Sequence, residues 1–245
     1  MSPGERIFVA LDVPTLAQAE GLVELLTPHV GGFKVGLELL TAAGAPTVIE
    51  RLRGGGRPIF FDGKFSDIPN TVAGATRAAA QLGVAMLNVH ALGGAAMMQA
   101  AVTAAAAGAR IGGWSPPKVL AVTVLTSLGV EALTQLGLEG LHDPASLEAF
   151  IVRLATRARE AGCDGVVASP REIPAIRRAC GQDFLIVTPG VRPSWSARGD
   201  QHRFTTPRAA IEAGADFLVI GRPVTNPPAE IGDPVAAVRK ILEEL

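Results

Sequence analysis

Short apolar runs recur along the chain, and most of them are followed by a stretch with helical spacing. The runs cover residues 7–12, 33–36, 58–62, 85–90, 119–124, 165–168, 184–188 and 216–220. Uninterrupted apolar runs of this length are typical of parallel strands that are buried on both faces. The stretches between them are rich in Ala, Leu, Glu and Arg, which favour helices. The pattern therefore predicts alternating strands and helices.

Several of the intervening helices can be placed from the sequence. Residues 15–26 repeat apolar side chains every three or four positions, which predicts one helical face. Near the C-terminus, Asp233 is expected to cap a last helix that begins with Pro234. The longest gap between strands holds an extra element around residues 130–138 and then a helix over 144–160.

The number of strand–helix units favours one architecture. Eight units in 245 residues predict a closed (β/α)8 TIM barrel of the α/β class, with residues 1–245 forming a single catalytic domain. An open, doubly wound sheet is the main alternative. It predicts fewer strands and no functional residues at both ends of the chain.

Charge and composition narrow the range of partners. The chain has 22 basic and 23 acidic residues, and its formal net charge of -1 gives no basic surface for nucleic acid. Cys163 and Cys180 lack disulfide or metal spacing and are typical of reduced thiols. The N-terminus shows no signal peptide, and no run approaches the roughly 20 uninterrupted apolar residues of a membrane span. We therefore expect a cytoplasmic protein without a metal, a membrane or a nucleic-acid partner.

Charged residues lie at the ends of several predicted strands. Asp62, Lys64 and Asp67 come directly after the third apolar run, and period-2 alternation places Asp62 and Lys64 on the same side of the chain. Asp12 ends the first run, and Lys34 lies inside the second. Catalytic residues of a barrel gather at the C-terminal ends of its strands. These charges of alternating sign therefore predict an electrostatic site at that rim.

The loops after the seventh and eighth strands have the composition of a phosphate site. One loop, residues 188–193, and the other, residues 221–224, each contain a glycine and an arginine. Glycine lets backbone N–H groups approach an anion, and arginine offers a planar set of donors to phosphate oxygens. In (β/α)8 barrels these two loops are a frequent phosphate-binding position. The polar segment 194–201 between them is predicted to be a mobile lid.

Residues 62–72 have the sequence Asp-Gly-Lys-Phe-Ser-Asp-Ile-Pro-Asn-Thr-Val. This segment resembles the signature of the orotidine 5'-phosphate decarboxylase family. Gly63 and Ser66 depart from the family pattern, but both occupy spacer positions. The whole chain resembles the bacterial, single-function form. Supporting segments occur in family order at residues 8–12, 33–36, 88–91, 122–127, 188–193 and 221–223.

The resemblance implies a reaction. It is the cofactor-free conversion of orotidine 5'-monophosphate to UMP and carbon dioxide, the last step of de novo pyrimidine biosynthesis. Loss of carbon dioxide leaves a carbanion that the pyrimidine ring cannot delocalise, so a fixed ammonium is needed to stabilise and then protonate it. By resemblance this ammonium belongs to Lys64, which Asp62 and Asp67 flank and Lys34 supports.

The resemblance also implies a homodimer and a set of substrate contacts. Asp67 and Thr71 are expected to reach the site of the neighbouring subunit. The other expected contacts are Asp12 and Lys34 at the ribose, Asp62 beside Lys64, Thr126 and Ser127 at the pyrimidine edge, Gln201 between base and phosphate, and Pro189, Arg192, Gly221 and Arg222 at the phosphate. No cofactor or metal is implied.

Two alternatives to this function stay open at this point. Related barrel enzymes that act on sugar phosphates share the Asp-x-Lys-x-x-Asp core but use magnesium to stabilise an enediolate. The pyrimidine enzyme is favoured by residues 68–71 and by the pair Thr126 and Ser127. Activity that EDTA does not reduce would distinguish it from the magnesium-dependent enzymes. The other alternative is a non-catalytic phosphate-binding barrel, against which the intact set of charges argues. His90 is expected to be structural.

Overall fold

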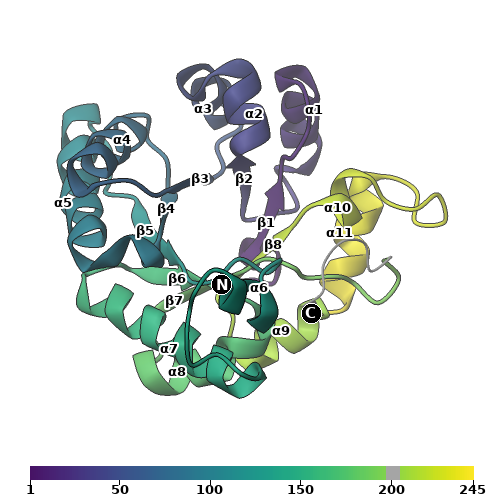
Figure 1. Cartoon of the computed structure of the whole chain (residues 1–245). Helices are drawn as coiled ribbons and strands as arrows, with labels where there is room; N and C mark the ends of the chain where they lie inside the picture. Colours follow the sequence, from purple (N-terminus) through teal and green to yellow (C-terminus); the bar gives the residue numbers. More distant parts are fainter. Residues whose placement is uncertain (197–204) are drawn as a thin grey trace.

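The computed structural model describes residues 1–196 and 205–245. In this part of the chain, eight parallel strands close into a barrel in sequence order, and the helices lie around its outside (Figure 1). Each strand overlaps one of the predicted apolar runs, so the predicted (β/α)8 barrel is confirmed. The strands are β1 (Ile7–Ala10), β2 (Gly32–Gly36), β3 (Ile59–Phe65), β4 (Met86–His90), β5 (Lys118–Val122), β6 (Gly165–Val167), β7 (Leu185–Thr188) and β8 (Phe217–Ile220).

Four of the helices, α1, α7, α9 and α11, begin at a side chain that caps the first turn. The predicted cap Asp233 accepts the backbone N–H of Ala236 at 2.8 Å, and Asp143 caps α7 in the same way through Ser146. The α-helices are α1 (Leu16–Leu26), α2 (Leu37–Ala43), α3 (Ala45–Arg53), α4 (Pro69–Gln81), α5 (Gly94–Gly112), α6 (Val130–Gln135), α7 (Pro144–Glu160), α8 (Ile173–Cys180), α9 (Pro207–Ala213), α10 (Arg222–Thr225) and α11 (Pro234–Glu243). Short 3-10 turns are η1 (Gly4–Arg6), η2 (Ala91–Gly93) and η3 (Pro170–Glu172).

Two apolar layers result from the alternation of side chains along the strands. In β1, Ile7 and Val9 face the helices, whereas Phe8 and Ala10 face the barrel interior. The inner layer lies within the barrel, below the C-terminal ends of the strands. It consists of Phe8, Ala10, Phe60, Met86, Leu120, Val187 and Val219.

The segment Ala91–Gly112, which contains α5, is long and apolar enough by length and composition to cross a membrane. Within the barrel, α5 packs along α4 and buries Met97, Met98 and Ala101 completely. Such burial on one side is typical of a core helix in a folded barrel, so we assign the helix a packing role.

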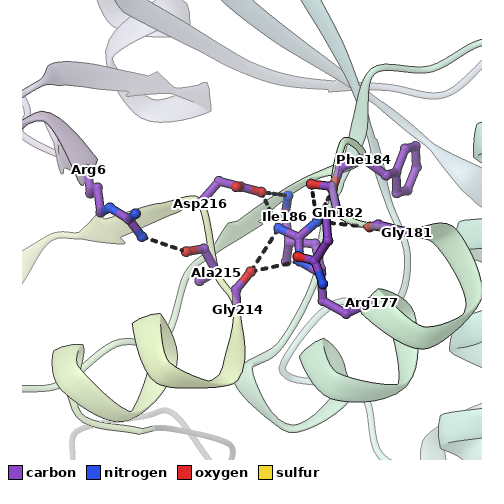
Figure 2. A network of polar contacts seen from close by, with 9 residues as sticks. All are labelled: Arg6, Arg177, Gly181, Gln182, Phe184, Ile186, Gly214, Ala215 and Asp216. Atoms are coloured by element: carbon purple, nitrogen blue, oxygen red, sulfur yellow. Dashed lines mark hydrogen bonds and ion pairs between the residues drawn. The ribbon is translucent and has the colours of Figure 1, made fainter. Parts of the chain in front are cut away.

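A buried arginine ties together the loops that enter β7 and β8. Arg177 in α8 donates to four backbone carbonyls and pairs with the carboxylate of Asp216, which also accepts the backbone N–H of Ile186 at 2.7 Å (Figure 2). The four carbonyls belong to Gly181, Gln182, Phe184 and Gly214. These loops lie at the N-terminal ends of the strands, which in barrels is the face that serves stability.

Candidate active site

A cavity of about 550 Å³ opens at the C-terminal ends of the strands. This volume lies within the range of sites for small-molecule ligands. The loops after β7 and β8 line it together with the ends of β1, β2 and β3. Nine residues predicted from the sequence contribute to its wall: Asp12, Lys34, Asp62, Lys64, Thr126, Pro189, Arg192, Gly221 and Arg222.

Four charged side chains form a continuous row of ion pairs in this wall. The ammonium of Lys34 lies 2.8 Å from Asp12 Oδ1 and 3.1 Å from Asp62 Oδ2. The other oxygen of Asp62, Oδ1, lies 2.7 Å from Lys64 Nζ. The signs therefore alternate along Asp12, Lys34, Asp62 and Lys64, as the strand-end pattern predicted. We call these four residues the charge array.

The inner members of the array are buried, and each keeps its charge because of its neighbours. Burial alone would lower the pKa of Lys34, but the carboxylates of Asp62 and Asp12 outweigh it and raise the pKa. Burial alone would likewise raise the pKa of Asp62, but the ammonium groups of Lys34 and Lys64 lower it. Both groups are therefore charged at neutral pH. Lys64 is the more accessible lysine, with 30% of its side chain exposed against 8% for Lys34.

The end of β3 differs from the prediction, which ended the strand at Asp62. The strand continues to Phe65, but its regular pairing with β4 is interrupted after Phe61. Lys64 has a φ of 49° and is the only non-glycine residue with positive φ in the described part of the chain. A bulge, rather than simple alternation, therefore brings Asp62 and Lys64 to the same cavity.

Sequence reasoning missed the glycine that makes room for the array. A Cβ atom at Gly36 would lie 2.9 Å from Lys34 Nζ and 3.0 Å from Asp12 Oδ1, so a larger residue would displace this ion pair. It also missed the largely apolar remainder of the wall, because such residues look like core in a sequence. These residues include Phe60, Val122, Val124, Val167, Ser169 and Val219.

The two predicted phosphate loops line the same cavity. In the loop after β7, Gly190 has a φ of 76°, a conformation that glycine adopts without strain. The side chain of Arg192 in this loop is buried, whereas Arg222 after β8 is exposed at the cavity mouth. Two guanidinium groups thus border the cavity, as a site for an anionic group requires.

Three of the predicted site residues that the structure describes, Asp67, Thr71 and Ser127, are not in the wall of this cavity. Asp67 and Thr71 are exposed, and no ion pair joins Asp67 to Lys64 among the described residues. Asp67 instead accepts the backbone N–H of Ile68 at 2.7 Å. Ser127 lines a neighbouring cavity of about 420 Å³. Gln201 and most of the predicted lid lie outside the described residues.

The remaining titratable candidates do not form a second centre. Burial and the nearby Lys64 ammonium lower the pKa of His90, so its imidazole is neutral at neutral pH. Burial raises the pKa of Cys163 to about 12, which leaves an unreactive thiol. Within residues 1–196 and 205–245, no three His, Cys, Asp or Glu side chains gather as metal ligands.

Comparisons with known proteins point to one family. A model described as "Orotidine 5'-phosphate decarboxylase / HUMPS family" matches residues 5–241. The orotidine 5'-phosphate decarboxylase of Moorella thermoacetica is 55% identical, and the match covers 100% of this chain and 94% of that protein. The protein of the same name from Geobacter sulfurreducens is 51% identical over 98% of this chain and 96% of its own length. A crystal structure of orotidine 5'-phosphate decarboxylase from Lactobacillus acidophilus has a TM-score of 0.80 and 37% identity, with 97% of both chains covered.

Proposed function

The chain belongs to the orotidine 5'-phosphate decarboxylase / HUMPS family, and we propose that it converts orotidine 5'-monophosphate to UMP and carbon dioxide in pyrimidine biosynthesis. The observation that carries this proposal is the charge array in the cavity wall of a chain whose full-length relatives bear this name. A cavity of about 550 Å³ accommodates a nucleotide.

In the proposed mechanism, Lys64 acts on the reacting carbon. The bond between the pyrimidine ring and its carboxylate breaks, carbon dioxide leaves, and the electron pair stays on the ring carbon. An ammonium beside that carbon stabilises the pair and then transfers a proton to it. Lys64 suits this role because its ammonium is accessible from the cavity and is held by Asp62 at 2.7 Å. Water can return the proton to its partly exposed side chain afterwards.

The rest of the array orients Lys64 and binds the sugar. The carboxylate of Asp62 is shared between Lys34 and Lys64, so both ammonium groups are anchored to one buried anion. The carboxylate of Asp12 is 54% exposed and is accessible to ribose hydroxyls, together with the Lys34 ammonium that it contacts. Asp62 thus orients the proton donor, whereas Asp12 and Lys34 hold the substrate.

The loops after β5, β7 and β8 would bind the base and the phosphate. Thr126 lies in the wall and, with Ser127, is proposed to contact the pyrimidine edge. Arg192 and Arg222, in the loops after β7 and β8, are proposed to bind the phosphate. Pro189 and Gly221 shape these loops, and Gln201 would bridge base and phosphate. Binding energy from the phosphate would help to hold the ring beside Lys64.

We also propose that two chains form a homodimer at the barrel mouths. Leu37, Ile68 and Leu92 follow the C-terminal ends of β2, β3 and β4, and they are 58%, 67% and 54% exposed. Large apolar side chains gathered on one rim support an interface there. Asp67 and Thr71 flank Ile68 on this rim, from which they would reach the partner's ribose.

A mixing experiment tests the shared site. Lys64→Ala and Asp67→Ala chains are each expected to be inactive, but a mixed dimer would contain one site with both residues intact. With random exchange of equal amounts, activity should recover to about a quarter of the wild-type value. If mass spectrometry detects mixed dimers but the mixture shows no decarboxylase activity, the shared site is excluded.

The activity itself is tested by ultraviolet absorbance with orotidine 5'-monophosphate in the presence of EDTA. We expect turnover to UMP that the chelator does not change. Turnover that EDTA abolishes and magnesium restores would instead favour the sugar-phosphate enzymes of the related barrel group. Binding without turnover would favour a non-catalytic phosphate-binding barrel.

The setting of the reaction is also a proposal. Bacterial relatives in a biosynthetic enzyme family support a soluble protein. We propose that residues 1–245 work as one catalytic domain in the cytoplasm. Activity in the membrane pellet of fractionated cells, with none in the supernatant, would contradict this location.

A further inference from the structure

The pairing of β3 with β4 is interrupted directly beside the charge array. Regular pairing stops at Phe61 and resumes only where Phe65 stands opposite Val89. Residues 62–64 of β3 therefore face a single residue of β4, Asn88. In such a bulge, backbone groups lose their regular partners, and other groups must satisfy them.

The side chain of Asn88 supplies the replacement hydrogen bonds. Its amide oxygen accepts the backbone N–H of Lys64 at 2.7 Å, and its amide nitrogen donates to Asp62 Oδ1, also at 2.7 Å. A backbone N–H can only donate and a carboxylate can only accept, so these partners determine which way the amide faces. Asn88 is completely buried, so water does not compete for either bond.

These two bonds hold Lys64 at both of its ends. The Asp62 oxygen that Asn88 contacts also accepts from Lys64 Nζ at 2.7 Å. The backbone of Lys64, at a φ of 49°, lies in a left-handed region that side-chain-bearing residues seldom adopt. Asn88 therefore supports both this backbone conformation and the carboxylate that orients the ammonium.

We propose that Asn88 is a positioning residue that aims the Lys64 ammonium at the reacting carbon by holding the Lys64 backbone and the Asp62 carboxylate together. Asn88 is not in the cavity wall, so it acts through these two residues rather than on the substrate. The inference rests on the proposed function and adds a residue that the charge pattern of the sequence did not single out.

The first test compares Asn88→Leu with wild type and with Leu87→Ala. Leu replaces the amide with an apolar group of similar volume and removes both hydrogen bonds. Misplacement of a catalytic group by about 1 Å costs on the order of 10²-fold, so kcat should fall by about that factor. KM should change by less than about threefold, because ribose and phosphate contacts persist. Leu87 is buried on the helix-facing side of the same strand, so Leu87→Ala destabilises the strand and should leave kcat within about twofold.

The second test uses Asn88→Asp, which keeps the shape of the side chain. When protonated, the introduced carboxyl can donate to Asp62 and accept from the Lys64 N–H, as the amide does. When ionised, it cannot donate and it faces the Asp62 carboxylate, which together with burial raises its pKa. The other charged or titratable groups nearby are Lys34 on β2, Lys64 on β3 and His90 on β4. The ratio of variant to wild-type kcat should therefore be higher at about pH 6 than at about pH 8.

Several results would overturn the positioning role. They are a kcat of Asn88→Leu within about twofold of wild type, the same loss in Leu87→Ala, or a flat pH ratio for Asn88→Asp. Wild-type turnover in the same assay separates this test from that of the proposed function. If wild type does not decarboxylate the substrate, a crystal structure of Asn88→Leu decides the question: Lys64 should leave the left-handed region, and an unchanged φ would contradict the inference.

Discussion

Replacement of Lys64 by alanine tests the centre of the proposed mechanism. The ammonium of Lys64 lies 2.7 Å from Asp62 and faces the cavity. Alanine removes both the charge that would stabilise the carbanion and the proton that would quench it. The ribose and phosphate contacts persist, so we expect kcat to fall steeply and substrate affinity to change much less.

The size of the loss follows from the position of the charge. An ammonium about 3 Å from a developing negative charge, at an effective dielectric constant of about 20, interacts with it by about 5.5 kcal/mol. This corresponds to a factor of about 10⁴ in rate. Loss of proton transfer acts in the same direction, so we expect a decrease on the order of 10⁴-fold. Ultraviolet absorbance with orotidine 5'-monophosphate in EDTA measures it.

Lys118→Ala provides a matched control. Lys118 forms an ion pair of 2.8 Å with Asp164 at the N-terminal end of β5, outside the cavity wall. Its removal should leave kcat within about twofold, because an exposed ion pair contributes little to stability. A folded Lys64→Ala protein that keeps even about a tenth of wild-type turnover would refute the role of Lys64.

Three further predictions follow from the same structure. Arg222→Ala should raise KM strongly and lower kcat/KM, because remote phosphate binding helps to close the site; unchanged discrimination between orotidine and its 5'-phosphate would contradict this. The folded pKa of Asp62 is lowered, so its contribution to stability is present above the pKa of an unfolded aspartate, about 3.9, and is lost as the pH falls through the folded value. As the pH falls below about 4, the free energy of unfolding should therefore decrease less in Asp62→Asn than in wild type, as measured by urea titration. The same pH dependence in both proteins would contradict the lowered pKa of Asp62. Arg177→Met should lower the free energy of unfolding by about 3–5 kcal/mol without changing kcat, because it removes the ion-pair partner of the partly buried Asp216 carboxylate and the donor to four backbone carbonyls at the N-terminal face of the barrel. Equal urea midpoints for the variant and wild type would show that the network does not contribute to stability.

Local patterns in the sequence were sufficient for the architecture. Runs of apolar residues placed all eight strands, with differences of a few residues at their ends, because burial on both faces demands uninterrupted apolar side chains. The final helix begins after Asp233 as predicted, since a side-chain cap depends only on residues three positions away. The charge array was also predictable, because barrel closure places the ends of neighbouring strands at one rim.

Only the tertiary structure decided how the array is held. The register between β3 and β4 determines the bulge in β3, the left-handed backbone of Lys64 and the two hydrogen bonds of Asn88. These hydrogen bonds join Asn88 to Lys64 and Asp62, which lie 24 and 26 positions away in the sequence. The need for glycine at position 36 likewise arises from the path of the Lys34–Asp12 ion pair in space. A periodic pattern specifies which face a side chain occupies, but not the register that determines its partner. The sequence by itself therefore determined the barrel and the kinds of residue at its rim, and the packing of neighbouring strands determined which atoms meet.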